Sequence, residues 1–121
     1  MAGTAARMLT DPPPDARLAA TGNTTLCVVV TDAALDPAGA ASVARMASSG
    51  LARAVSPGGT RVDGDVVICL ATGRRPGNVW FGGGAGAAAA AAAVRAAVRP
   101  ATAVRGVPTA ADRRDGWTRE V

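Results

Sequence analysis

Two polar residues stand where the chain enters its most strand-like run. Asn23 and Thr24 directly precede Thr25–Thr31, which is β-branched and apolar enough to be a buried strand. The Thr24 hydroxyl could attack the carbonyl carbon of Asn23, convert the peptide bond to an ester and, after hydrolysis, leave Thr24 as a new N-terminus. Its freed α-amino group, with a reference pKa of about 7.7 to 8.0, would then act as base for its own hydroxyl. The alternative is a plain polar strand entry, because threonine is common in strands.

A second candidate for chemistry is the Asp63-Gly64-Asp65 segment at the start of a later strand-like run. Residues two apart in an extended segment point to the same face, so Asp63 and Asp65 would present two carboxylates together. Like charges that close raise one of the two pKa values, which suits proton transfer. The alternative interpretation is a turn, because Asp-Gly is a frequent turn pair.

The composition excludes several classes of catalytic site. The 121 residues contain no His and no Lys, which removes Ser/His/Asp sets, the Walker motif and His-based metal centres. Cys27 and Cys69 fall inside strand-like runs, where a free Cys behaves as a small apolar residue. The run Gly84–Ala89 loosely fits a dinucleotide fingerprint, but no acidic residue follows until Asp112. We therefore expect no cofactor and no metal.

Charge and hydropathy give little sign of a nucleic-acid or membrane partner. The net charge of +4 comes from 13 Arg against nine acidic residues, without the aromatic interleaving or recognisable module of a nucleic-acid-binding protein. No secretory signal is visible. The longest Ala/Val run, Ala87–Val94, is far shorter than the roughly 20 residues that span a membrane. The sequence predicts a soluble cytoplasmic protein that binds neither nucleic acid nor membrane.

The first half of the chain predicts a linker, a strand and a helix. Met1–Thr21 contains three consecutive prolines and no periodic pattern, as is typical of a linker. After the strand Thr25–Thr31, Asp36 is a good N-cap and Pro37 a good first helical residue. Apolar residues then recur at intervals of three and four, so we expect a helix over Pro37–Ala54 with one apolar face.

The second half predicts another strand and another helix. Val62–Thr72 is a strand candidate, and its core Val66–Ala71 is continuously apolar, as expected of a strand covered on both faces. Gly73–Gly86 is interpreted as a glycine-rich connection and Ala87–Arg99 as a helix. Ala101–Val121 is interpreted as an irregular tail.

This order of elements indicates an α/β layered unit. We expect the two strands to be neighbours in one sheet, with both helices on the same face. Two strands make a small sheet, and a core built mainly of alanine, with one Phe, two Trp and no Tyr, buries little area. We therefore expect the unit to associate with itself or with another polypeptide.

Four blocks in this order resemble one enzyme family. They are Asn23-Thr24-Thr25-Leu26, Val28-Val29-Val30-Thr31-Asp32-Ala33, Gly50-Leu51-Ala52-Arg53-Ala54, and Asp63-Gly64-Asp65 with Leu70-Ala71-Thr72-Gly73. Together they resemble the C-terminal part of the DmpA-type peptidases, which include D-aminopeptidases, β-peptidyl aminopeptidases and nylon-oligomer hydrolases. The resemblance is close over Gly22–Gly73 and loose over Ala87–Pro108.

The resemblance implies an autoproteolytic N-terminal-nucleophile hydrolase with an αββα sandwich fold, cleaved into an α and a β subunit and assembled as a homo-oligomer. Thr24 then matches the nucleophile at the start of the β subunit, and Asn23 the last residue of the α subunit. Asp63 and Asp65 match positions implicated in catalysis. Residues 1–23 would be a linker and the remnant of the α subunit, 24–108 the β-subunit-like portion and 109–121 a tail.

The sequence departs from the family in one large respect, because the α portion, which supplies a Lys or Tyr and an Asn, has no counterpart in these residues. We expect a hydrolase of peptides or amides that is incomplete without an α portion. Ornithine acetyltransferases share the layout, including Val62-Asp63-Gly64-Asp65, so acyl transfer is an alternative. A non-catalytic fragment is another. The substrate, whether α-peptide, β-peptide or polyamide oligomer, is not indicated by these blocks.

Overall fold

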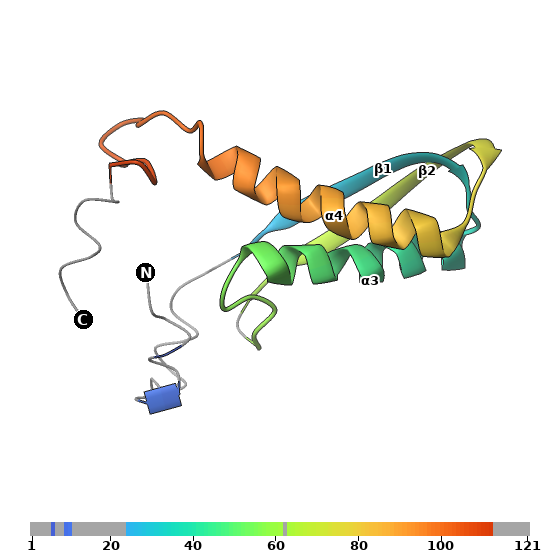
Figure 1. Cartoon of the computed structure of the whole chain (residues 1–121), viewed down its shortest axis with the longest axis horizontal. Helices are drawn as coiled ribbons and strands as arrows, with labels where there is room; N and C mark the ends of the chain where they lie inside the picture. Colours follow the sequence, from blue (N-terminus) through green and yellow to red (C-terminus); the bar gives the residue numbers. More distant parts are fainter. Residues whose placement is uncertain (1–5, 7–8, 11–23, 62, 113–121) are drawn as a thin grey trace.

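The chain folds as a small α/β unit. The computed structural model describes residues 6, 9–10, 24–61 and 63–112. Its main elements alternate along the chain (Figure 1) as β1 (Leu26–Ala34), α3 (Pro37–Ala54), β2 (Val66–Pro76) and α4 (Val79–Val98). The predicted α/β class and the order of the four elements are confirmed.

The two strands form a parallel pair. Their register runs from Leu26 opposite Val66 to Thr31 opposite Ala71, and it shifts between Thr31 and Ala33. The burial of both strands alternates residue by residue, because successive side chains point to opposite faces of a sheet. Parallel pairing places the N-terminal ends of β1 and β2 at the same end of the sheet, and therefore brings Thr24 and the Asp63-Gly64-Asp65 segment to that end.

Both helices lie side by side on one face of the strand pair, as predicted (Figure 1). The buried residues between them are small apart from two aliphatic side chains; they are Val43, Ala47, Leu51, Ala87, Ala90 and Ala91. Gly50 of α3 lies directly against the backbone of Ala87 in α4. This contact leaves no room for a side chain and lets the two helices approach closely.

Helix α3 begins where local signals place it. The Asp36 side chain accepts a hydrogen bond from the amide of Gly39 at 2.6 Å, and Pro37 occupies the first helical position. An N-cap acceptor satisfies one of the backbone donors that a helix start leaves unpaired. The predicted bounds, Pro37–Ala54, coincide with those observed.

Helix α4 corrects the prediction for the glycine-rich segment. Gly73–Gly86 is not a connection, because α4 begins at Val79 and includes Gly82, Gly83, Gly84 and Gly86. Asn78 caps it by accepting hydrogen bonds from the amides of Trp80 and Phe81 at 2.8 and 3.2 Å. Gly83 lies against the Met46 side chain of α3. Glycine is unfavourable in an isolated helix, but here it provides the space that close helix packing needs.

The face of the sheet opposite the helices is open among the described residues, which corrects the expectation that β2 is covered on both faces. Its six apolar side chains are between 45% and 75% exposed; they are Leu26, Val28, Val30, Val66, Ile68 and Leu70. Only the other face, with Val29 and Val67, meets the helices. The continuous apolar pattern of Val66–Ala71 therefore indicates a surface that is suited to burial and is not buried within this chain.

The longer α4 also changes the longest apolar segment of the chain. Within the described residues, α4 is the one helix whose length and composition would allow it to cross a membrane. This is weak evidence for a membrane span, because core helices of soluble proteins pass the same test. One side of α4 is packed on α3 through Gly83, Gly86, Ala87, Ala90 and Ala91.

Candidate active site

The Thr24 side chain lies directly against Gly64. A Cβ atom built on Gly64 would be 2.6 Å from Thr24 Oγ1, which is closer than such atoms ever approach. Only a glycine at position 64 allows the Thr24 hydroxyl to occupy this place. The parallel register, in which the next described partners are Leu26 and Val66, explains the contact.

Asp65 fixes the backbone next to Thr24. Its Oδ1 accepts a hydrogen bond from the Thr25 amide at 2.8 Å, and its Oδ2 accepts one from the Gly59 amide at 3.2 Å. The Thr25 carbonyl in turn accepts from the amide of Val66 at 3.0 Å. Both backbone polar groups of Thr25 are thus held, and the position of the adjacent Thr24 is fixed relative to β2.

Asp63 stabilises the loop that precedes β2. Its Oδ2 accepts a hydrogen bond from the Thr60 amide at 2.7 Å, and its own amide donates to the Thr60 carbonyl at 3.2 Å. Both interpretations of the Asp63-Gly64-Asp65 segment are therefore represented, since Asp63 closes a turn and Asp65 reaches the neighbouring strand.

The structure brings Thr24, Asp63, Gly64 and Asp65 together at one end of the sheet. In the described part of the chain no side chain forms a hydrogen bond with the Thr24 hydroxyl, and the two carboxylates accept from backbone amides instead. This arrangement can position a nucleophile. A catalytic role for Thr24, Asp63 or Asp65 stays a prediction, and Asn23, the other half of the expected cleavage junction, lies outside the described residues.

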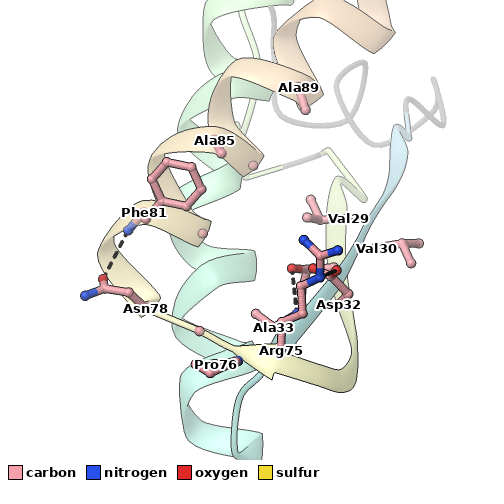
Figure 2. Close-up of a pocket in the computed structure, with 14 residues that line it drawn as sticks. Val29, Val30, Asp32, Ala33, Arg75, Pro76, Asn78, Phe81, Ala85 and Ala89 are labelled. Atoms are coloured by element: carbon pink, nitrogen blue, oxygen red, sulfur yellow. Dashed lines mark hydrogen bonds and ion pairs between the residues drawn. The ribbon is translucent and has the colours of Figure 1, made fainter.

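An apolar groove of about 550 Å³ lies at the other end of the sheet, between β1 and the first turns of α4 (Figure 2). Val29, Phe81, Ala85 and Ala89 line it. At its mouth Asp32 Oδ2 and Arg75 Nε form an exposed ion pair at 3.2 Å. Thr24 does not line this groove, because it stands at the N-terminal end of β1 whereas the groove lies at the C-terminal end.

A shallower depression of about 340 Å³ adjoins the Thr24 end of the sheet. It lies between α3 and the start of β2, and Arg45, Ser48, Gly59 and Asp65 are among its lining residues. Among the residues that the structure describes, no group of three His, Cys, Asp or Glu side chains is placed to hold a metal ion. The polar groups near Thr24 are therefore hydrogen-bonding groups of the chain itself.

Comparison with known families places this end of the sheet in context. The family model of peptidase family S58 matches residues 2–111, which include both Thr24 and Asp65. The chain belongs to peptidase family S58. This is the DmpA family that the four sequence blocks indicate, and the resemblance is confirmed.

Individual relatives in the family carry aminopeptidase names. The chain is 55% identical over 51 residues to an uncharacterized aminopeptidase of Mycobacterium leprae, a match that covers 42% of this chain and 14% of that protein. It is 51% identical over 51 residues to uncharacterized aminopeptidases of Mycobacterium tuberculosis and Mycobacterium bovis, covering 42% of this chain and 15% of each. The matched segment is thus about a seventh of the length of these S58 relatives.

Sequence reasoning missed one residue of the candidate site. Gly64 was considered only as part of a turn, yet its missing side chain is what admits the Thr24 hydroxyl. The signal was present in the sequence as a glycine between two carboxylates. Its meaning depends on the parallel pairing of β1 and β2, which a turn-based interpretation does not contain.

Proposed function

We propose that this member of family S58 is the nucleophile-bearing portion of a peptide or amide hydrolase, with Thr24 as the nucleophile. The observation that carries the proposal is the placement of the Thr24 hydroxyl against Gly64, between two strands whose relative position is held by Asp65. Membership in a peptidase family and the aminopeptidase names of the relatives support hydrolysis over acyl transfer.

The proposed chemistry begins with processing of the Asn23–Thr24 bond. Thr24 Oγ attacks the Asn23 carbonyl carbon, the C–N bond breaks, and the nitrogen takes up the hydroxyl proton to become the α-amine of Thr24. Water then hydrolyses the resulting ester, which gives a carboxylate on Asn23 and restores the Thr24 hydroxyl. In substrate hydrolysis the same hydroxyl attacks an amide, with the freed α-amine as base.

Asp65 supports this chemistry as a positioning residue. It accepts from the Thr25 amide and from the Gly59 amide, so it ties the start of β1 to the loop before β2. The α-amine of a processed Thr24 would emerge within the same group of residues. Asp63, which holds the Thr60 amide, shapes the loop that carries Gly64 and Asp65.

Processing also requires hydrogen-bond donors for the oxyanion that develops on the Asn23 carbonyl. Loss of one such donor typically slows acyl chemistry by about a hundredfold to a thousandfold. We assign these donors to an α portion of the family fold, which the 121 residues do not resemble, and we assign the covering second sheet of an αββα sandwich to the same portion. The substrate is a peptide or amide oligomer.

Intact-mass measurement tests the proposal. The purified 121-residue chain is expected to stay uncut, whereas the chain supplied with the remaining portion of a mycobacterial relative is expected to lose residues 1–23. Thr24→Ala should abolish both this cleavage and amide hydrolysis. Spontaneous release of a fragment beginning at Thr24 from the chain alone would show that no α portion is needed.

The neighbouring hydroxyl provides a matched control. Thr25→Val keeps a β-branched side chain and the amide that binds Asp65, so cleavage should continue after Asn23. Cleavage that survives Thr24→Ala would end the assignment of the nucleophile. Absence of cleavage and of hydrolysis in every combination, with a folded chain, would favour a non-catalytic fragment.

A further inference from the structure

The open face of the β1–β2 sheet is the largest contiguous apolar surface that the described residues define. Six aliphatic side chains alternate onto it from the two strands; they are Leu26, Val28, Val30, Val66, Ile68 and Leu70. Side chains of this size and exposure leave on the order of 500 to 600 Å² of apolar surface, the upper end of the largest patch found on monomeric proteins. Parallel sheets occur almost only with both faces covered.

We infer that this face is an isologous dimer interface, covered by the same face of a second copy of the chain. Two such faces stacked on each other would remove on the order of 1,100 Å² from water, which exceeds the roughly 1,000 Å² expected of a specific interface. Apolar sheet faces pack on each other about 10 Å apart with interdigitated side chains. The available area therefore fits a complete partner face of the same size.

The composition of the face favours a second copy as its occupant. None of its six side chains is charged or polar, so two identical faces meet without like-charge repulsion. The nearest charge on β1, that of Asp32, is already paired with Arg75 at the rim. An apolar centre with a polar, charge-balanced rim is the usual anatomy of a protein interface, and twofold homodimers are the commonest soluble oligomers.

Register identifies the residues at the centre. Val28 pairs with Ile68 across the sheet, and each is the middle member of its strand's apolar triplet. Any twofold stacking that covers the whole face therefore brings Val28 and Ile68 against the same two residues of the second copy. A charge at Ile68 would face the equivalent charge of the partner.

The exposed aromatic residues at the start of α4 form the rival surface. Trp80 and Phe81 are 80% and 79% exposed, but they project from the helix layer, remote from the open sheet face. Phe81 lines the groove beside β1 (Figure 2). A dimer formed through these aromatics would leave the sheet face open, so the two arrangements predict opposite effects of substitution.

Sedimentation velocity over a concentration series tests the inference. The unmodified chain should sediment as a dimer. Ile68→Glu should raise the dimer dissociation constant by about a hundredfold or more, because it buries like charges against each other. Phe81→Glu, the matched control on an equally accessible apolar residue, should remain dimeric. A monomeric or polydisperse unmodified chain, a dimer that persists in Ile68→Glu, or loss of the dimer in Phe81→Glu would overturn the inference.

A charge-complementation mixture covers the case in which Ile68→Glu cannot fold without its partner. The Ile68→Glu and Ile68→Lys chains are purified separately, mixed, and followed by circular dichroism and sedimentation. Restoration of a folded one-to-one dimer supports stacking of the two sheet faces, and failure of the mixture to associate contradicts it. These experiments measure mass and fold only, so their outcome is independent of whether Thr24 acts as a nucleophile.

Discussion

The Asp65 carboxylate of β2's leading segment accepts a hydrogen bond from the backbone amide of Thr25 at 2.8 Å. The two residues are 40 positions apart, and their contact exists because the strands pair in parallel from Leu26 and Val66 onward. The second carboxylate oxygen accepts from Gly59 at 3.2 Å. One side chain therefore joins the residue after Thr24 to the loop between α3 and β2.

Asp65→Ala should destabilise the fold by about 1 to 3 kcal/mol, because it leaves a partly buried backbone amide without its charged acceptor. Urea unfolding followed by circular dichroism at a fixed protein concentration measures the change, and amide hydrogen exchange at Thr25 should become faster. Asp32→Ala is the control, since its ion pair with Arg75 is exposed and should contribute less than about 1 kcal/mol. Equal effects of the two variants would contradict the positioning role of Asp65.

Gly64→Ala should displace the Thr24 hydroxyl without unfolding the chain. The added methyl group would meet Thr24 Oγ1 at 2.6 Å, and the Thr24 side chain can rotate away while the backbone stays in place. A displacement of about 1 Å can slow a reaction by roughly a hundredfold. Cleavage at Asn23–Thr24 in the reconstituted protein should slow accordingly, and the NMR coupling constants of Thr24 should report a changed rotamer.

Gly84→Ala is the matched glycine control for this experiment, because nothing lies within 4 Å of a Cβ atom at that position. It should leave both cleavage and the Thr24 rotamer unchanged. A Gly64→Ala variant that is cut as fast as the unmodified protein would show that the contact between Gly64 and Thr24 has no part in processing.

The accuracy of the sequence predictions differs between the two helices for a physical reason. The start of α3 depends on local chemistry, an Asp N-cap followed by Pro37, and the predicted helix matches the observed one residue for residue. The start of α4 depends on tertiary packing, because its glycines are poor helix formers that become useful only beside Met46 and Gly50 of α3. Asn78 was the local signal that could have placed it.

The candidate site divides in the same way. The spacing of Asp63 and Asp65 was sufficient to predict two nearby carboxylates, and the strand pattern was sufficient to bring them near Thr24. Their different partners, the amide of Thr60 for one and of Thr25 for the other, could not be predicted, since they depend on the strand register and on the loop conformation. The open sheet face was missed because an apolar pattern reports suitability for burial and says nothing of what covers it.

The Asp112 carboxylate provides a pH-dependent prediction at the far end of the described chain. The hydroxyl of Thr109 donates to Asp112 Oδ2 at 2.7 Å and its amide donates at 2.8 Å, and these bonds lower the pKa of Asp112 from its ordinary value of 3.8. A lowered pKa means that the local turn is stabilised above about pH 3.8 and loses this contribution as the pH falls through the lowered value.

Thr109→Val removes the hydroxyl donor and keeps the amide, so the pKa of Asp112 should rise toward 3.8. An NMR titration of the side-chain carboxyl carbon measures it. Thr102→Val, at another exposed threonine of the same segment, should leave the titration of Asp112 unchanged. Because Asp112 is fully exposed, the melting temperature of the whole unit should not respond to either change. An unaltered Asp112 titration in Thr109→Val would contradict the assignment.

The contact between Gly50 and Ala87 should govern the stability of the helix layer. A methyl group on Gly50 would overlap the backbone carbonyl of Ala87, and backbone atoms cannot rotate aside, so α3 and α4 would have to separate. Gly50→Ala should therefore destabilise the fold by about 3 kcal/mol, the upper part of the range for overpacking, even though alanine is the better helix former. Gly84→Ala, where the space is open, should instead stabilise it by up to about 1 kcal/mol. Urea unfolding of the two variants at one protein concentration measures both effects, and a shift of the same sign in both would show that α3 and α4 do not pack through Gly50.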